Sequence, residues 1–258
     1  MILLAIETAT SVESLALVTE GKLLAELDLD NGLSHSPRLL KDIDFLFKAL
    51  GLSISGISAV AVSSGPGSFT GLRVGFSLAK GLAYAAKKPF IAIPTLDAFA
   101  FSVCSLSGGV AGKEPKSRPE KVYCPILDAR KNEFYFSAYA EEGNTLLKLL
   151  AENALSIKDL LKELKQIKAD KYYFFGDGIS KCRAEIKNTI KDPVFLEAAP
   201  RAASVGALAL LKLGRGEKQD FNKALPFYVR RPDAVINKEL KDSGEKSAKS
   251  KKNGGKRS

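Results

Sequence analysis

The chain has 258 residues, 45% of them apolar, and a formal net charge of +10. At a rough prior of about 150 residues per domain, this length fits one large domain or two small ones. Charged residues interrupt the longest apolar stretches at Glu7, Asp97 and Lys212, so none approaches the roughly 18 residues that a membrane-spanning helix needs. Three widely spaced cysteines, without a Cys-x-x-Cys pair, argue against a disulfide framework and a zinc site.

The opening residues predict a β-hairpin. The apolar run Ile2–Ile6 is followed by the polar turn Glu7–Ser11, a return strand at Ser14–Val18 and a further strand at Lys22–Leu29. No basic segment precedes the first run, and the run meets Glu7 far too early for a signal-peptide core. We therefore expect a strand here, and a cytoplasmic protein.

A first helix is predicted after Ser36, which is a suitable N-cap, with Pro37 at the first helical position and Gly51 at the end. Apolar residues recur along this helix at helical spacing: Leu39, Leu40, Ile43, Leu46, Phe47 and Leu50. The helix is therefore expected to have a wide apolar face.

The next elements alternate between strand and helix. A buried-type strand at Ile57–Val62 leads through the loop Ser63–Ser68 into a helix that ends near Lys87. A strand at Phe90–Ile93 then precedes a helix that begins at Thr95. Such alternation predicts an α/β protein with a partly parallel sheet and packed helices.

A segment rich in Gly, Ser, Pro and charge, Leu106–Lys121, divides the chain. After it the opening design returns, with a strand at Val122–Asp128, a turn at Ala129–Asn132 and a return strand at Glu133–Tyr139. The acid that ends the first strand of the chain recurs here as Asp128. This recurrence suggests a duplicated fold core.

The remaining elements also read as an α/β half. They are a helix at Ser156–Ile167, a strand at Tyr172–Phe175, a helix at Ser180–Ile190, a strand at Val194–Leu196 and a helix at Arg201–Leu213. We therefore predict an N-terminal α/β subdomain at residues 1–105 and a C-terminal α/β subdomain at 106–236. The helix near 200–213 is expected to be able to pack back on the N-terminal half.

The C-terminal tail at residues 237–258 is strongly basic. From Lys238 onward it carries eight Lys or Arg against three acids, and Ala248 is the only apolar residue after Leu240. Such a segment cannot bury enough apolar surface to offset its ordering entropy, so we expect a disordered, solvated end. The alternative is a loose contact with nucleic acid through phosphate neutralisation.

Three stretches, in this order and spacing, resemble the TsaB family. They are Ile2–Thr10, Ser64–Gly75 and Leu127–Tyr135, of which the second contains the specific run Gly-Pro-Gly-Ser-Phe-Thr-Gly-Leu-Arg. The resemblance covers roughly residues 1–235, and Leu225–Arg230 is similar to the usual C-terminal end of the family. The basic tail lies outside it.

This resemblance implies the actin-like ATPase fold of sugar kinases, actin and heat-shock chaperones, which is ribonuclease H-like and built from two related α/β halves. It also implies a non-catalytic scaffold that binds the transferase subunit TsaD, with the P-loop ATPase TsaE joining them. The complex would place threonylcarbamoyl on the tRNA adenosine beside the anticodon. Alone, the chain is expected to form a homodimer, without a membrane partner.

In the actin-like fold the opening hairpin normally cradles phosphates. The candidate nucleotide-binding residues here are Glu7, Thr8, Thr10 and Ser11. The turn has no glycine to let its backbone approach a phosphate closely, and Glu7 is longer than the aspartate usual in the ATPases. A structural turn is the favoured interpretation. No cofactor is expected, and ATP or ADP would bind only at the contact with a partner subunit.

Glycines open and continue the second predicted helix. Gly65-Pro-Gly67 invites a phosphate-loop interpretation, but no Gly-Lys-Ser/Thr follows, so a shaped turn is favoured. Glycine costs up to about 1 kcal/mol in a helix interior, so the repeat Gly71, Gly75 needs a compensating close approach, by the chain's own sheet or by a partner. The predicted partner-binding residues are Leu39, Ile43, Leu46, Gly71, Arg73 and Gly75.

Two rival functions stay open. An actin-like-fold enzyme, either an ATPase or kinase or a peptidase, would need groups that the sequence supplies poorly, because His35 is the only histidine and no Gly-x-Ser-x-Gly motif is present. Asp128, Arg130 and Glu133 could form an acid/base cluster, but on a hairpin a local ion pair is as easily expected. A stand-alone RNA-binding module is supported only by the tail, since no aromatic and basic platform is visible in the body.

Overall fold

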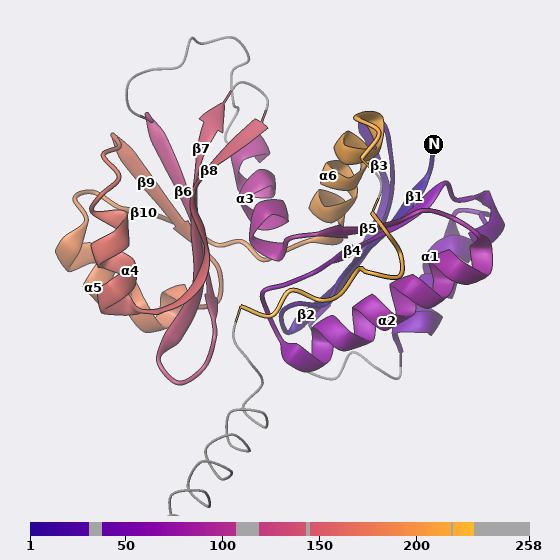
Figure 1. The fold of residues 1–258 in the computed structure, drawn as a ribbon, viewed down its shortest axis with the longest axis horizontal. Coiled ribbons are helices and arrows are strands. Elements are labelled where there is room, and N and C mark those ends of the chain that lie inside the picture. Colours follow the sequence, from indigo (N-terminus) through magenta and orange to yellow (C-terminus); the bar gives the residue numbers. More distant parts are fainter. Residues whose placement is uncertain (31–37, 107–118, 143–144, 218, 230–258) are drawn as a thin grey trace, which may run out of the picture.

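A computed structural model describes residues 1–30, 38–106, 119–142, 145–217 and 219–229. It contains two five-stranded sheets with the same internal strand order, third, second, first, fourth and fifth (Figure 1). The N-terminal sheet consists of β1 (Leu3–Glu7), β2 (Val12–Thr19), β3 (Lys22–Asp30), β4 (Ala59–Ser63) and β5 (Phe90–Ile93). The C-terminal sheet consists of β6 (Lys121–Asp128), β7 (Glu133–Glu142), β8 (Thr145–Ser156), β9 (Lys171–Phe175) and β10 (Val194–Leu196).

Each half therefore begins with an antiparallel hairpin whose first strand also pairs in parallel with a later strand. In the N-terminal half β1 pairs with β2 and β4, and in the C-terminal half β6 pairs with β7 and β9. The predicted duplication of two related α/β halves is confirmed by this shared topology. β8 has no counterpart among the predicted elements, because its spaced leucines resemble neither a regular helix nor an alternating strand.

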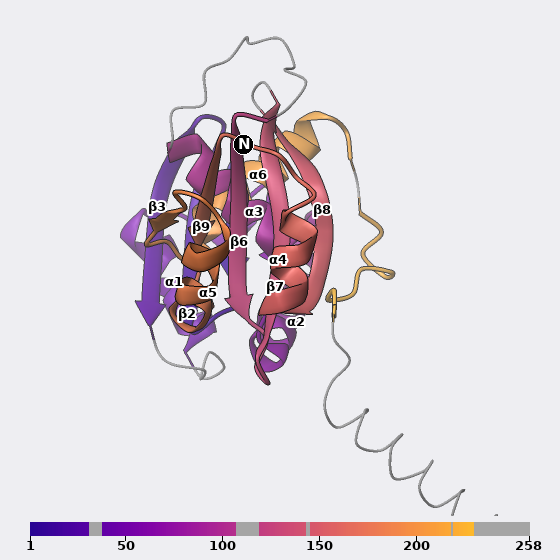
Figure 2. The ribbon, with the colours of Figure 1, turned by 90° about the vertical axis from the view of Figure 1, so that its left-hand side faces the viewer.

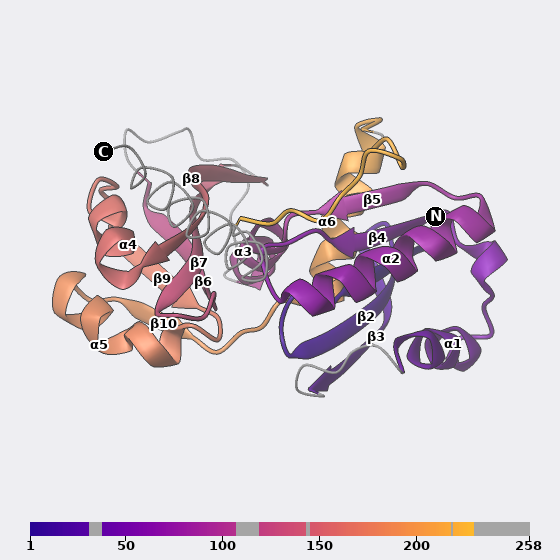
Figure 3. The same ribbon diagram turned by 60° about the horizontal axis from the view of Figure 1, so that its bottom comes forward.

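The helices cover both faces of each sheet (Figures 1 and 3). They are α1 (Leu39–Ala49), α2 (Phe69–Ala86), α3 (Thr95–Leu106), α4 (Ile157–Leu164), α5 (Ile179–Thr189) and α6 (Ala202–Gly214), with a short 3-10 helix at Ile54–Gly56. α1 and α2 cover one face of the N-terminal sheet and α6 covers the other. α4 and α5 cover the outer face of the C-terminal sheet, which is turned to the viewer in Figure 2, and α3 covers its inner face.

α6 returns from the end of the second half to the sheet of the first. It packs on β1 and β2, and its first turn is completed by that half, because the backbone N–H groups of Ala202 and Ala203 donate to Ser14 Oγ (2.8 Å) and Glu26 Oε1 (2.9 Å). Arg201, at the N-cap position, makes no side-chain cap of its own. Two donors that a helix start leaves unpaired are thus satisfied by residues from β2 and β3.

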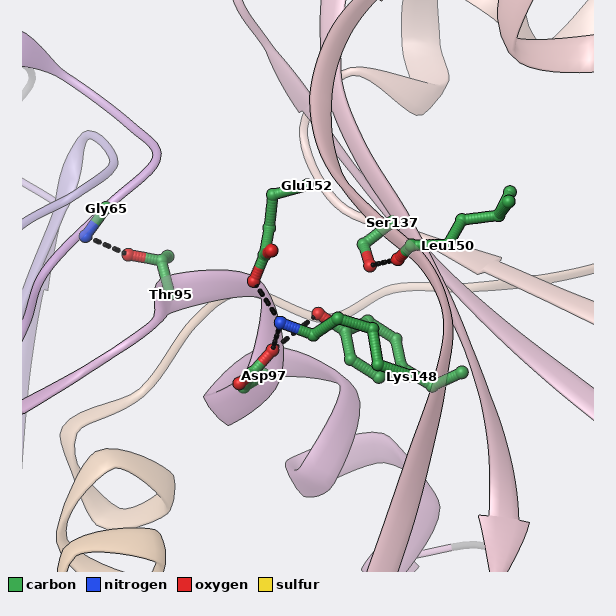
Figure 4. Close-up of polar contacts among 8 residues, drawn as sticks. Gly65, Thr95, Asp97, Ser137, Lys148, Leu150 and Glu152 are labelled. Carbon is green, nitrogen blue, oxygen red and sulfur yellow. Dashed lines mark hydrogen bonds and ion pairs between the residues drawn. The ribbon is translucent and has the colours of Figure 1, made fainter. Parts of the chain in front are cut away.

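α3 connects the halves from its N-terminus. Thr95 exchanges two hydrogen bonds with Gly65, one from its backbone N–H (2.8 Å) and one to its Oγ1 (3.1 Å). Two residues further on, Asp97 accepts a hydrogen bond from the Tyr139 hydroxyl (2.7 Å). Asp97 also pairs with Lys148 (2.7 Å), as Figure 4 shows. The loop before α2 and the C-terminal sheet are therefore both held by this helix.

The segment at residues 219–229, which we call the strap, follows α6 and lies over β5 and α2 (Figure 3). The Gln219 side chain accepts a hydrogen bond from the Ala92 amide (2.7 Å), and Lys80 of α2 donates to the Ala224 carbonyl (2.9 Å). No helix in the described part of the chain is long and apolar enough to cross a membrane.

Candidate functional site

The turn between β1 and β2 lies beneath the start of α2. Glu7 and Thr8 are fully buried. Glu7 Oε1 accepts a hydrogen bond from the Ala9 backbone N–H (2.6 Å), and the Thr8 hydroxyl donates to the Gly71 carbonyl (2.9 Å). These three polar groups of the turn are therefore engaged within the chain.

Glycine permits this close approach of α2. A Cβ atom at Gly75 would overlap the Thr8 hydroxyl, and one at Gly67 would overlap the Ala9 carbonyl. That carbonyl also accepts a hydrogen bond from the Ser68 backbone N–H (2.6 Å). The cost of glycine in the first half of α2 is thus offset by packing on the chain's own hairpin, which was one of the two explanations left open by the sequence.

Two of the backbone donors at this turn are engaged within the turn itself. Besides the Ala9 amide, the Val12 amide donates to Thr10 Oγ1 (3.3 Å). Thr10 and Ser11 line a cleft between the two halves with a volume of about 360 Å³, whereas Glu7 and Thr8 do not. Of the four predicted nucleotide-binding residues, Glu7 and Thr8 thus lie in the packed turn, whereas Thr10 and Ser11 line the cleft. Among the described residues, no group of three acids, histidines or cysteines is placed to hold a metal ion.

The equivalent turn of the second half is closer to solvent. Asp128 Oδ1 accepts from the Arg130 backbone N–H (3.0 Å), and its Oδ2 pairs with Lys181 (2.6 Å). Burial alone would raise the pKa of Asp128, but the hydrogen bonds and charges of Lys181 and Arg130 hold it below the ordinary value. Asp128 is thus an ion-paired residue that closes the turn.

Asp177, in the Gly176-Asp-Gly178 turn, lies beside that ion pair and on the wall of the same cleft. Its Oδ1 accepts a hydrogen bond from the Asp128 backbone N–H (3.0 Å). Burial raises the pKa of Asp177, and the neighbouring negative charge of Asp128 adds to the increase, against the lowering effect of the backbone hydrogen bonds. The two aspartates are therefore shifted in opposite directions by their surroundings.

The structure corrects most of the predicted partner-binding set. Leu39, Ile43 and Leu46 form no exposed apolar face, because they are buried in the core between α1 and the N-terminal sheet. Gly71 and Gly75 face the β1–β2 turn. Only Arg73 of the six lies at the surface, where its guanidinium stacks 3.8 Å from the centre of the Phe69 ring. His35 and the predicted helix start at Ser36 lie outside the described residues.

Other residues of the same two helices are exposed. Leu40 and Phe45 of α1 leave 57% and 61% of their surface accessible. On α2, Gly81 is exposed and an added Cβ atom would meet nothing within 4 Å, while Val74 and Leu78 beside it are half-buried. We call these five residues the α1–α2 face. Phe45 lies off the regular apolar spacing of α1, which is the sequence signal that could have separated the outer face from the core.

Comparison with known proteins gives consistent results. Residues 32–238 match the family model described as TsaD: tRNA N6-adenosine threonylcarbamoyltransferase. The chain is 26% identical over 238 residues to the tRNA threonylcarbamoyladenosine biosynthesis protein TsaB of Bacillus subtilis, covering 91% of this chain and 96% of that protein. It is 32% identical to TsaB of Escherichia coli over 178 residues, which are 69% of this chain and 72% of the relative.

The chain belongs to the TsaB family. Among solved structures, YeaZ from Pseudomonas aeruginosa superimposes with a TM-score of 0.72 at 26% identity, covering 88% of this chain and all of that one. A second Pseudomonas aeruginosa structure, described as an uncharacterized protein with similarity to peptidase YEAZ, gives a TM-score of 0.71 at 25% identity and covers 89% of this chain and 99% of that one. This TsaB-family chain has the two related α/β halves that the sequence resemblance implied.

Proposed function

We propose that this chain is a non-catalytic subunit in tRNA threonylcarbamoyladenosine biosynthesis. It binds a TsaD-type transferase subunit and supports the transfer of threonylcarbamoyl to the adenosine beside the anticodon. The observation that carries the non-catalytic role is the packing of α2 on the β1–β2 turn, where Thr8 bonds to Gly71 and Glu7 bonds to the Ala9 amide. The Thr8 hydroxyl and the Ala9 amide are thus engaged within the chain, which leaves fewer donors for a phosphate at this turn.

The α1–α2 face is the proposed contact with TsaD. Gly81 supports this assignment because a helix-interior glycine costs up to about 1 kcal/mol, and nothing inside the chain lies within 4 Å to explain it. A partner backbone that approaches closely would explain it. Exposed Leu40 and Phe45 add apolar surface on the neighbouring helix, as expected of an interface. The same face would form the homodimer in the absence of TsaD, and a TsaE-type ATPase and tRNA would join through the complex.

Two substitutions test the contact. Gly81→Leu and Phe45→Asp should each weaken binding to the TsaD subunit of the same organism by about tenfold or more, measured by titration calorimetry, because both alter the centre of the proposed interface. Neither variant should unfold at a lower temperature than the unaltered chain, since neither position is buried. Leu147→Asp is the matched control, because Leu147 is also exposed but lies on β8 of the other half. Unchanged affinity in both variants would reject this face.

The non-catalytic role has its own test. The purified chain is expected neither to hydrolyse ATP nor to cleave peptides. ATP turnover that copurifies with the chain and is abolished by Asp177→Asn would contradict the proposal, because Asp177 is one of the two acids, with Glu197, that line the cleft between the halves. In that case the actin-like-fold enzyme becomes the better description.

A further inference from the structure

A cavity lies between α3 and α6, the two helices that stand between the sheets (Figure 1). Its volume is about 180 Å³. Ile93 at the end of β5 contributes to its wall from the N-terminal sheet, and Tyr139 of β7 and Lys148 of β8 contribute from the C-terminal sheet. A molecule bound in this cavity would therefore touch both halves of the chain.

Most of the described lining of the cavity is apolar. α3 contributes Phe101, and α6 contributes Leu208 and Leu211. Phe101 and Leu208 are half-buried, whereas Leu211 leaves 43% of its surface accessible. An apolar cavity of about 150 Å³ in another protein holds one benzene molecule, so the volume between α3 and α6 suits an apolar body of about one ring.

The charge on the wall of the cavity is not balanced. Among the described lining residues, Lys148, Lys212 and Arg215 are cationic and Asp97 alone is acidic. Lys148 pairs with Asp97 (2.7 Å) and also with Glu152, as Figure 4 shows. Within the described part of the chain, Lys212 and Arg215 form no ion pair. Two positive charges beside an apolar cavity are thus left for an anion from outside the chain.

The position of these two cations on their helix explains only part of the arrangement. Lys212 lies in the last turn of α6 and Arg215 follows it, where a positive charge interacts favourably with the helix dipole. Lys187 has the same position in the last turn of α5, but it does not line this cavity. The helix dipole therefore accounts for the charges and does not account for the apolar cavity beside them.

We propose that the cavity binds a small carboxylate whose apolar body is about the size of one ring. The ring lies against Phe101 and Leu208, and the carboxylate is held by Arg215 and Lys212. A guanidinium offers two parallel N–H donors that match the two oxygens of a carboxylate, and small-molecule sites typically combine apolar walls with a few such polar groups. None of the lining residues belongs to the α1–α2 face, so this site is separate from the proposed contact with TsaD.

The test measures binding of benzoate to the full chain by titration calorimetry, at low ionic strength and in a buffer without carboxylate. Benzamide keeps the ring and removes the charge, so it should bind about tenfold more weakly or worse. Acetate keeps the charge and removes the ring, so it should also bind more weakly than benzoate.

Substitutions at the mouth of the cavity identify the site. Arg215→Gln and Lys212→Gln should each weaken benzoate binding by about fivefold or more and leave benzamide binding unchanged. Lys187→Gln is the matched control, because it removes a cation from the last turn of another helix. Leu211→Trp, at an exposed position, should fill the cavity and abolish binding of both ligands.

Several results would overturn the proposal. They are no benzoate binding by the unaltered chain, equal affinities for benzoate and benzamide, and unchanged benzoate affinity in both Arg215→Gln and Lys212→Gln. An equal loss in Lys187→Gln would show a general effect of charge and would also overturn it. If Leu211→Trp unfolds at a lower temperature than the unaltered chain, the two charge variants decide, because Arg215 is exposed and Lys212 is half-buried.

Discussion

The first turn of the N-terminal half lies under α2, whereas the corresponding turn of the C-terminal half lies near the surface beside Lys181. In both turns a carboxylate at the strand end accepts a hydrogen bond from the amide two residues later, Glu7 from Ala9 and Asp128 from Arg130. Glu7 is fully buried, whereas its counterpart Asp128 is half-buried and the neighbouring Arg130 is exposed. The hydrogen bond within the turn is thus the same in both halves. The halves differ in the contacts that the turn makes with the helix after the next parallel strand, which is α2 after β4 and α5 after β9.

That helix approaches each hairpin through glycine, but it meets different groups. At α2 a Cβ atom on Gly75 would meet the Thr8 hydroxyl, and at α5 one on Gly178 would meet the side chains of Ile126 and Phe134. In the N-terminal half the helix therefore packs on a polar group of the turn, the Thr8 hydroxyl. In the C-terminal half it packs on the apolar side chains of Ile126 and Phe134. Two halves of the same topology thus use their first turns differently.

The largest expected effect is the loss of stability when a glycine that packs on a hairpin is substituted, in α2 or at the start of α5. Gly75→Leu should destabilise the chain by about 3 kcal/mol, because the buried hairpin cannot move away from the added side chain. Gly178→Ala should cost about 1 kcal/mol, since the Ile126 and Phe134 side chains can shift slightly. Gly81→Leu, at the exposed position of α2, should stabilise the chain by up to about 1 kcal/mol, because leucine has the higher helix propensity and meets no neighbouring atom. Urea unfolding of the three variants checks this order, and equal costs at positions 75 and 81 would contradict it.

The next largest effect is the difference in stability loss when the two strand-end carboxylates, Glu7 and Asp128, are removed. Glu7→Ala should cost about 2 to 3 kcal/mol, because it leaves the buried Ala9 amide without its acceptor. Asp128→Ala should cost about 1 kcal/mol or less, because Lys181 is half-exposed and water can reach the turn. Urea denaturation at neutral pH measures both. A larger loss at Asp128 would show that the ion pair, rather than burial, stabilises these turns.

The smallest effect depends on pH. The pKa of Asp177 is raised above its ordinary value of 3.8, so its charge disfavours the folded state at neutral pH and the penalty disappears as pH falls through the folded pKa. Asp177→Asn should therefore stabilise the chain slightly at pH 7 and have no such effect below about pH 3.8. Asp128→Asn should instead destabilise the chain at pH 7, because the pKa of Asp128 is lowered and its charge favours the folded state. Unfolding midpoints measured at both pH values test the pair, and equal signs at pH 7 would be incompatible with it.

Much of the fold could be predicted because the hairpins, the strand-end acids and most helix starts leave local patterns. The strand β5 at Phe90–Ile93 and the strand β10 at Val194–Leu196 have their predicted bounds. β8 was missed because its register against β7 shifts twice, which breaks the alternation that marks a strand.

The candidate site was less predictable for a physical reason. Helical spacing identifies the apolar stripe of α1, but such a stripe normally faces the core, so Leu39, Ile43 and Leu46 were assigned to the wrong surroundings. Spacing also cannot distinguish Gly75, which meets Thr8, from Gly81, which meets nothing in the chain. Only the three-dimensional contacts separate a glycine needed for folding from one available to a partner.

The return of α6 to the first sheet has a consequence for synthesis on the ribosome. The inner face of the N-terminal sheet, including Leu3 and Ala5, is covered by Val205 and its neighbours, and α6 draws on Ser14 and Glu26 to complete its first turn. The first half thus emerges with one apolar face bare, and about one hundred further residues must be translated before α6 can cover it. A nascent chain stalled before Ala202 should expose that face, recruit chaperones and resist folding, whereas release of α6 should allow both halves to become stable together.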